Sequence, residues 1–260
     1  MEAGFRTPLL DMFRRGEVSR EIKMLAARGA LAPRAHEQLM LLTGLVDDPE
    51  PEVRTAAEET LAAIPRAALE SFLARADTSP TLRDFFSARG IQAAAAPAAD
   101  SEEPLIDRGA PAGLTPDAEE ADKQGTVQRL SVMTIGERMK VAMKGTREER
   151  AILIRDPNKL VSVAVLSSPK INESEVENFA KMANVSDEVL RIIGNTRAWV
   201  KSYGITSALA RNPKTPVAIA LSLVQRLNER DLKMIATDRN AQEPLKLAVR
   251  KRLTHGKKEE

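Results

Sequence analysis

The C-terminal half of this 260-residue sequence repeats itself every 28 residues. In each copy an Asp or Asn stands five residues before a Val or Leu, and the same spacing occurs twice in the N-terminal half, 29 residues apart. A fixed period of this length indicates stacked supersecondary units, none of which buries its apolar face without its neighbours. The six starting residues are Asp48, Asp77, Asp156, Asn184, Asn212 and Asn240.

The apolar pattern inside these copies is helical. Counting from the Val or Leu, the third and fourth following residues are apolar in all six copies, as Ala220 and Leu221 show. The second following residue varies in character, from Ile219 to Asp84. This combination describes one face of a helix, so the strand-like alternation of residues 161–165 yields to the pattern that all copies share.

Start signals predict two helices in each unit. Ser79–Pro80 and Thr215–Pro216 are typical of an N-cap followed by proline in the first turn. A second helix begins with the spacing of a capping box in three units, which pair Thr146 with Glu149, Asn172 with Glu175, and Asn228 with Asp231. One unit is therefore a helix hairpin of 28 residues, and the predicted fold class is all-α. Residues 17–46 are predicted to form a degenerate first hairpin.

Composition divides the chain at residues 91–128, which are rich in Ala, Pro, Gly and acidic residues. We expect a disordered linker here. The linker carries two basic and eight acidic residues, whereas residues 129–260 carry 25 basic and 15 acidic ones. We predict an N-terminal helical repeat domain at 1–90, the linker, a basic helical repeat domain at 129–254 and a charged tail at 255–260. One hypothesis is that the acidic linker folds back onto the basic domain and screens its charge.

One stretch of the chain resembles a known family. Residues 48–57, Asp-Pro-Glu-Pro-Glu-Val-Arg-Thr-Ala-Ala, are similar to the D-P-x-x-x-V-R-x-x-A signature of HEAT-like helical repeats in bacterial proteins. The C-terminal units depart from this signature, because Ser, Leu, Ala and Lys replace its Arg. The resemblance implies two HEAT-like stacks joined by the linker: about three hairpins before it, and a right-handed solenoid of about four after it.

The sequence holds no recognisable catalytic constellation. Because it has no cysteine and two histidines, it lacks thiolate ligands, a cysteine nucleophile and a multi-histidine metal site. His36 lies among charged residues of a predicted helix and His255 lies in the basic tail, so neither indicates a catalytic base. Phosphate-loop, dinucleotide and nucleophile-elbow motifs do not occur. We therefore assign no catalytic, cofactor-binding or metal-binding residue and expect no enzyme activity.

Trp199 and Tyr203 are the sole Trp and Tyr, and their spacing predicts that they share one face of a second helix. Arg197 and Lys201 alternate with them. One interpretation is a stacking platform flanked by cations, which suits a base, a peptide or an aromatic side chain. The other, which is favoured, is packing inside or between the repeats.

Arg155, Arg211 and Arg239 each directly precede the Asp or Asn of a unit. In a stack of units they are expected to lie along one edge, where Lys214 and Lys246 extend them into a basic ladder. This ladder suits phosphates or an acidic protein surface. Each arginine also falls near a helix C-terminus, where the helix dipole favours a cation, so the structural interpretation has equal weight.

These features favour a non-enzymatic protein–protein interaction scaffold, since repeat stacks present wide concave surfaces. The first alternative is a nucleic-acid-binding module that uses the C-terminal basic surface, and the last is an enzyme or accessory resembling HEAT-like lyases and glycosylases. We expect a protein partner, no cofactor and no small-molecule substrate. A cytoplasmic location without membrane contact is expected, because the charged N-terminus is not a signal peptide and no apolar run approaches a membrane span.

Overall fold

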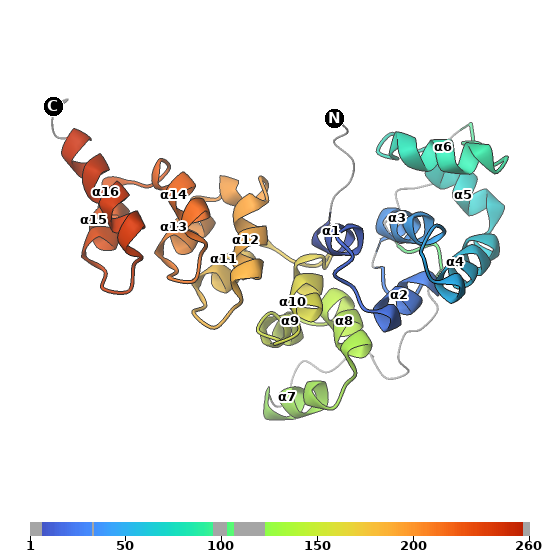
Figure 1. Cartoon of the computed structure of the whole chain (residues 1–260), viewed down its shortest axis with the longest axis horizontal. Helices are drawn as coiled ribbons and strands as arrows, with labels where there is room; N and C mark the ends of the chain where they lie inside the picture. Colours follow the sequence, from blue (N-terminus) through green and yellow to red (C-terminus); the bar gives the residue numbers. More distant parts are fainter. Residues whose placement is uncertain (1–6, 33, 96–102, 107–122, 257–260) are drawn as a thin grey trace. The chain divides into compact units, whose positions relative to one another are not determined.

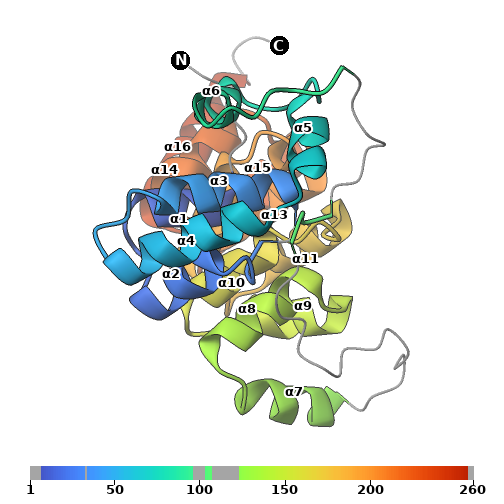
Figure 2. The ribbon, with the colours of Figure 1, turned by 90° about the vertical axis from the view of Figure 1, so that its right-hand side faces the viewer.

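A computed structural model describes residues 7–32, 34–95, 103–106 and 123–256. Their contacts divide into two compact units (Figures 1 and 2). The N-terminal unit runs to Thr146 and includes residues 167–169, and the C-terminal unit comprises residues 147–166 and those from Lys170 onward. Every regular element within the described ranges is helical, which confirms the predicted all-α class.

The N-terminal unit is organised around α3. This helix contacts α1, α2, α4 and α6, and its Leu39 and Leu42 are completely buried (Figure 2). α2 packs along α4 and also contacts α8, where the Leu25 side chain fills the space that a side chain at Gly136 would take. The helices are α1 (Pro8–Arg14), α2 (Arg20–Ala27), α3 (Ala35–Leu45), α4 (Pro51–Ala63), α5 (Arg66–Leu73), α6 (Pro80–Ala88), α7 (Lys123–Ser131) and α8 (Ile135–Lys144).

In the C-terminal unit, helices pack in successive pairs (Figure 1). α10, α12, α14 and α16 contact one another in that order, and α9, α11 and α13 form a second series. The elements are α9 (Arg147–Leu153), α10 (Lys159–Leu166), α11 (Glu173–Lys181), α12 (Asp187–Asn195), the 3₁₀ helix η1 (Trp199–Lys201), α13 (Tyr203–Arg211), α14 (Val217–Val224), α15 (Glu229–Thr237) and α16 (Glu243–Gly256).

Side-chain amides bond one helix pair to the pair before it. The Asn212 amide nitrogen donates to the carbonyls of Ala180 and Met182, at 2.8 and 2.9 Å. Gln242 also bonds to the preceding pair, from a different position of its unit, and donates to the carbonyls of residues 213 and 215 in the turn before α14, at 2.7 and 3.0 Å. Each amide thus satisfies backbone acceptors that the end of a helix or the turn after it leaves free.

The recurring Asp or Asn is in several copies a turn residue. The side-chain oxygens of Asp48, Asp156 and Asn212 each accept the backbone N–H two residues later, at 3.0, 2.8 and 3.0 Å. This Asx turn directs the chain into the helix that follows. In the last copy the turn lies two residues earlier, because Asp238 accepts from the N–H of Asn240 at 2.8 Å.

At three of the predicted helix starts, the expected side chain caps the helix by a hydrogen bond. Ser79 caps α6, Asn172 forms a complete capping box with Glu175 at α11, and Asn228 caps α15 by accepting the N–H of Asp231. Each cap satisfies one of the N–H groups that the first turn of a helix leaves without a partner.

Thr215 is not the cap that the sequence predicts. Pro216 is the N-cap of α14, and its carbonyl accepts from the N–H groups of Ile219 and Ala220. The Thr215 carbonyl instead accepts from Gln242, which commits this residue to the bond between helix pairs. Its side chain is fully buried, and the hydroxyl has no hydrogen-bond partner within the described part of the chain.

The compact units divide at a different place from the composition. Residues 129–146, which we expected in the C-terminal domain, group with the N-terminal unit because α8 packs on α2. Of the expected linker, residues 96–102 and 107–122 lie outside the described residues, whereas Ile106 is hydrogen-bonded to α3. α16 includes residues 255 and 256, and the rest of the expected tail lies outside the described residues.

Candidate functional site

The arginines of the basic ladder lie at helix ends. The Nε atoms of Arg155 and Arg211 donate to the carbonyls four residues earlier, those of Ala151 and Ser207, at 3.1 and 3.3 Å. These bonds satisfy carbonyl acceptors that the C-terminus of a helix leaves without a partner. The helix dipole also favours a cation at that end. Both guanidinium groups therefore have a structural role, although both residues remain exposed.

The other members of the ladder differ in exposure. Arg239 and Lys214 are exposed. Lys246 is 9% exposed, and its ammonium donates to Glu243 at 3.1 Å and to the Arg239 carbonyl at 3.5 Å. The Lys246 ammonium is thus bonded to the first turn of α16 and to the turn before that helix, and the ladder presents fewer cations to solvent than the sequence predicts.

Trp199 and Tyr203 do not share one helix. Trp199 begins η1 and Tyr203 begins α13, and the backbone of Ser202 between them is extended, with φ −70° and ψ 124°. Because this break interrupts the i, i+4 relation, the spacing does not produce the predicted aromatic face. Arg197 precedes η1, Lys201 is its last residue, and both are exposed.

Tyr203 fastens α13 to the start of α15. Its hydroxyl donates to a carboxylate oxygen of Asp231 and accepts the N–H of Asn228 at 3.2 Å. The same Asp231 oxygen also accepts from Ser207 at 3.1 Å. Desolvation and the bond to Asp231 raise the pKa of the Tyr203 hydroxyl. The packing interpretation therefore describes this side chain, although Tyr203 is still 44% exposed.

A buried ion pair joins α9 to α11. The sequence analysis did not predict this pair. Arg150 donates to both carboxylate oxygens of Glu175, at 2.9 Å each from one nitrogen, and a second nitrogen donates at 3.1 Å. The two side chains are 5% and 2% exposed. Beside them lies a depression of about 280 Å³ whose lining includes Phe179 and Met182. Because Glu175 also completes the capping box of α11, its carboxylate is fully engaged.

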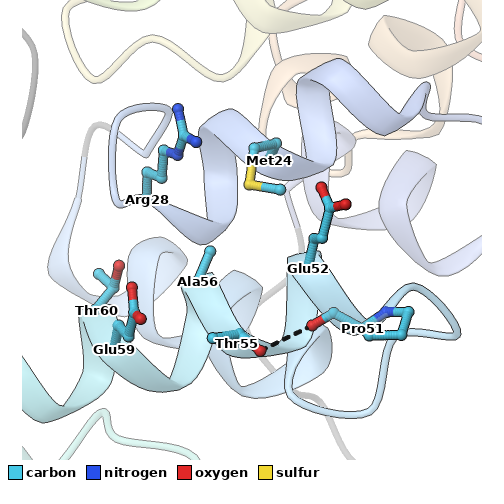
Figure 3. A pocket seen from close by; sticks show the side chains of 8 residues that line it. All are labelled: Met24, Arg28, Pro51, Glu52, Thr55, Ala56, Glu59 and Thr60. Carbon is cyan, nitrogen blue, oxygen red and sulfur yellow. Dashed lines mark hydrogen bonds between the residues drawn. The ribbon is translucent and has the colours of Figure 1, made fainter.

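The larger depressions lie on the N-terminal unit, along α2 and α4. Two adjoining hollows of about 610 and 670 Å³ share Met24, Arg28 and Glu52, and together we call them the α2/α4 groove. Figure 3 shows the first, where Met24 and Ala56 face each other across the two helices. At one end Arg20 is paired with Glu50 at 2.6 Å and with Glu52. The lining residues of the first hollow are Met24, Arg28, Pro51, Glu52, Thr55, Ala56, Glu59 and Thr60.

A segment outside the helices, residues 103–106, is bonded to α3 close to this groove. The amide nitrogen of Gln38 donates to the carbonyl of Ile106, and the Ile106 N–H donates back to the amide oxygen at 3.1 Å. Gln38 is 1% exposed and also donates to the carbonyl of Gly29 at 3.3 Å. Its distance of 68 residues from Ile106 explains why no local pattern announces the contact.

Glu37 is a buried carboxylate on α3 that ties this helix to α1. It is fully buried and accepts from the hydroxyl of Thr7, the N-cap of α1. Its second oxygen has no hydrogen-bond partner among the described residues. Burial raises the pKa of Glu37 to about 7, although the Thr7 bond and the charge of Arg34 act in the opposite direction. The carboxylate of Glu37 therefore titrates near neutral pH.

Three further searches, for metal sites, for membrane-spanning helices and for similar proteins, assign no role to these surfaces. Within the described ranges, no three His, Asp or Glu side chains gather as a metal site would require. Helices that combine the length and the apolar character needed to cross a bilayer are also absent from those ranges. Neither a family model, nor a curated protein, nor a solved structure matches the chain.

Proposed function

We propose that this protein is a non-enzymatic protein–protein interaction scaffold built on HEAT-like helical repeats. The observation that carries the proposal is the packing of successive helix pairs, which the amides of Asn212 and Gln242 bond together from different positions of the repeat. Together with the 28-residue sequence period, this packing supports a stack of hairpins in which each pair contacts the one before it. Stacks of this kind present extended surfaces that suit a macromolecular partner.

The last helix pair supplies apolar contact area for such a partner. Met234 on α15 and Leu247 on α16 are 40% and 63% exposed, and the two helices pack on each other. Basic side chains lie on the same pair, at Arg230 and Arg250. Methionine and arginine are enriched in protein interfaces, where apolar contact is surrounded by charged groups.

Nucleic-acid binding through the basic ladder is the alternative, and the ladder geometry supports it less. Arg155 and Arg211 bond to helix-end carbonyls, and Lys246 is buried beside Glu243. A surface that tracks a phosphate backbone needs cations whose main interaction is with the ligand. The ladder keeps four exposed cations, but two of them, Arg155 and Arg211, also bond to helix-end carbonyls, and we therefore favour a protein partner.

The test compares two variants of the full chain. Affinity capture at physiological and at raised salt is expected to retain one protein partner with the wild type and with the triple Arg155→Ala/Arg211→Ala/Arg239→Ala variant. Met234→Asp/Leu247→Asp is expected to lose it. Labelled random single-stranded and duplex DNA and RNA are titrated in parallel. Nucleic-acid binding that falls about tenfold or more with modest salt and disappears in the triple variant would overturn the proposal.

A further inference from the structure

Residues 103–106 are held on the N-terminal unit through both main-chain hydrogen-bonding groups of Ile106. One side-chain amide, that of Gln38, bonds both the N–H and the carbonyl of Ile106. This two-way pairing is the bond pattern of β-augmentation, in which main-chain groups of an extended peptide supply the affinity. Here a glutamine on α3 takes the place of the strand edge.

The residues around Gln38 are shaped for an occupant. Gly29 adopts a φ of +74°, and a Cβ there would lie 3.2 Å from the Thr60 side chain and 3.6 Å from that of Ile106. A glycine is therefore favoured by the backbone conformation and by the close approach of Thr60, whereas the Ile106 side chain lies at ordinary contact distance. We call Gly29, Gln38 and Thr60 the Gln38 slot.

Emptying the slot exchanges bonds within the protein for bonds to water. Without residues 103–106, the Gln38 amide would keep its bond to the Gly29 carbonyl and lose both bonds to Ile106. A hydrogen bond within a protein contributes about 0.5–1.5 kcal/mol over the bonds to water that it replaces. Any segment that restores this pairing therefore has an energetic advantage over solvent.

The Gln38 slot opens toward the α2/α4 groove. Thr60 belongs to both, and Arg28 precedes Gly29 in the chain (Figure 3). Across this end of the groove, Arg28 and Glu59 have no side-chain partner within the described residues. A peptide longer than four residues would therefore meet a cation, an anion and the apolar side chains of Met24 and Ala56.

We propose that the Gln38 slot is a peptide-binding site, and that residues 103–106 are the ligand that this chain supplies to itself. The ligand class is an extended segment with a branched aliphatic residue whose N–H and carbonyl both pair with Gln38. A partner protein that carries such a segment binds by displacing residues 103–106. This site lies in the N-terminal unit and does not depend on the proposed scaffold function of the C-terminal one.

Attachment in the same chain sets the strength of the competition. A tethered segment acts at an effective concentration in the millimolar range, so a free peptide binds the wild type more weakly than it binds an emptied slot. Replacing Leu105 and Ile106 by Asp empties the slot in the full chain, because carboxylates cannot take the place of the half-buried aliphatic side chains. Val132→Asp is the matched control, since Val132 lies in the same unit and is 81% exposed.

The probe is a fluorescein-labelled peptide with the sequence of residues 101–108, Ser-Glu-Glu-Pro-Leu-Ile-Asp-Arg. We expect the Leu105→Asp/Ile106→Asp chain to bind it about tenfold more tightly than the wild type and the Val132→Asp chain do. Adding Gln38→Ala to the emptied chain is expected to abolish binding. A second probe, N-methylated at the isoleucine, removes the N–H that donates to Gln38 and is expected to lose binding without any change in the protein.

Three results would overturn the proposal. The first is that the emptied chain fails to bind the probe at millimolar concentration. The second is that the N-methylated probe binds as well as its parent; this comparison is decisive even where Gln38→Ala does not fold, because the protein is unchanged. The third is a wild-type dimer in size-exclusion chromatography with light scattering that Leu105→Asp/Ile106→Asp converts to monomer. That result would assign the contact to exchange of the segment between two copies of this chain.

Discussion

The two units use the same chemistry for different purposes. In the C-terminal unit, Asn212 and Gln242 direct their amides at backbone carbonyls about 30 residues away, and each bond lies between packed helix pairs. In the N-terminal unit, Gln38 directs its amide at Ile106, 68 residues away, in a segment that belongs to no helix. The first arrangement joins packed helices, whereas the second holds a segment that lies outside the described helices.

This difference shows that the bonding pattern of an amide does not define its role. What distinguishes the two is the packing around the bonded segment, because a carbonyl at a helix end cannot leave without disturbing that helix. A segment fixed at one residue can leave at the cost of its own bonds. Variants in each unit therefore test the comparison, and the sole tryptophan, Trp199, reports on the C-terminal unit alone.

The largest effect is expected at the buried ion pair of the C-terminal unit. Arg150→Ala leaves the Glu175 carboxylate buried without its cation, which costs about 3–5 kcal/mol. Urea unfolding followed by Trp199 fluorescence measures the loss. The control is Arg191→Ala, which removes an exposed pair with Asp187 and Glu188 and is expected to cost about 0.5 kcal/mol. Equal losses in the two variants would contradict the structural role of Arg150.

In the N-terminal unit, Glu37 makes stability depend on pH. The folded state keeps this proton up to about pH 7, whereas an exposed glutamate releases it near 4.5, so the folded state binds more protons in that window. Stability therefore falls as the pH rises through the window, by about 3 kcal/mol in total.

The neighbouring His36 acts in the opposite direction, because burial lowers its pKa. The measurement therefore compares the wild type with Glu37→Gln, using hydrogen exchange of α1 and α3 corrected for intrinsic rates. The wild type is expected to lose protection relative to Glu37→Gln between about pH 5 and pH 8. A parallel pH profile in the two proteins would show that Glu37 is already ionised in the folded state.

The comparison between the units is sharpest for Asn212→Ala beside Ile106→Asp. Asn212→Ala removes both donors to the α11 end and the Asx turn before α14, and we expect the C-terminal unit to lose about 1–3 kcal/mol. Ile106→Asp is expected to change the stability of the N-terminal helices by less than about 0.5 kcal/mol while residues 103–106 lose protection from exchange. If Ile106→Asp destabilised α3 and α4 as strongly, residues 103–106 would be part of the core.

The smallest effects are expected at the two helix starts that the sequence presents as equivalent. Ser79→Ala removes a cap from α6 and is expected to cost about 1 kcal/mol, measured by exchange of that helix. Thr215→Val removes a buried hydroxyl that lacks a partner among the described residues, so Trp199-monitored unfolding should show no loss. A loss of stability in Thr215→Val would indicate that its hydroxyl takes part in the turn.

Sequence reasoning was most reliable where a signal is local. The helical class and the caps at Ser79, Asn172 and Asn228 depend on spacings of three or four residues, and the structure contains them. The break at Ser202 was not predictable from spacing, because the i, i+4 pattern of Trp199 and Tyr203 reads identically on an unbroken helix.

Contacts between distant residues required the structure. The pairing of Gln38 with Ile106 and the ion pair of Arg150 with Glu175 join residues whose neighbours in sequence show no shared pattern. A buried Arg or Glu on a short amphipathic helix looks like any surface charge until the opposite helix is placed. Lys246 was expected among the surface cations for another reason, because its partners are only three and seven residues away and its spacing does not reveal that the side chain is buried.

The contacts of the Gln38 slot limit which substitutions relatives of this chain can accept. A side chain at position 29 would strain the backbone and would also crowd Thr60, with or without Ile106. A descendant that lost Gln38 would have no further use for an aliphatic residue at position 106, whereas position 29 would still be limited by the turn and by Thr60. Positions 38 and 106 are therefore expected to change together among relatives, while position 29 stays glycine.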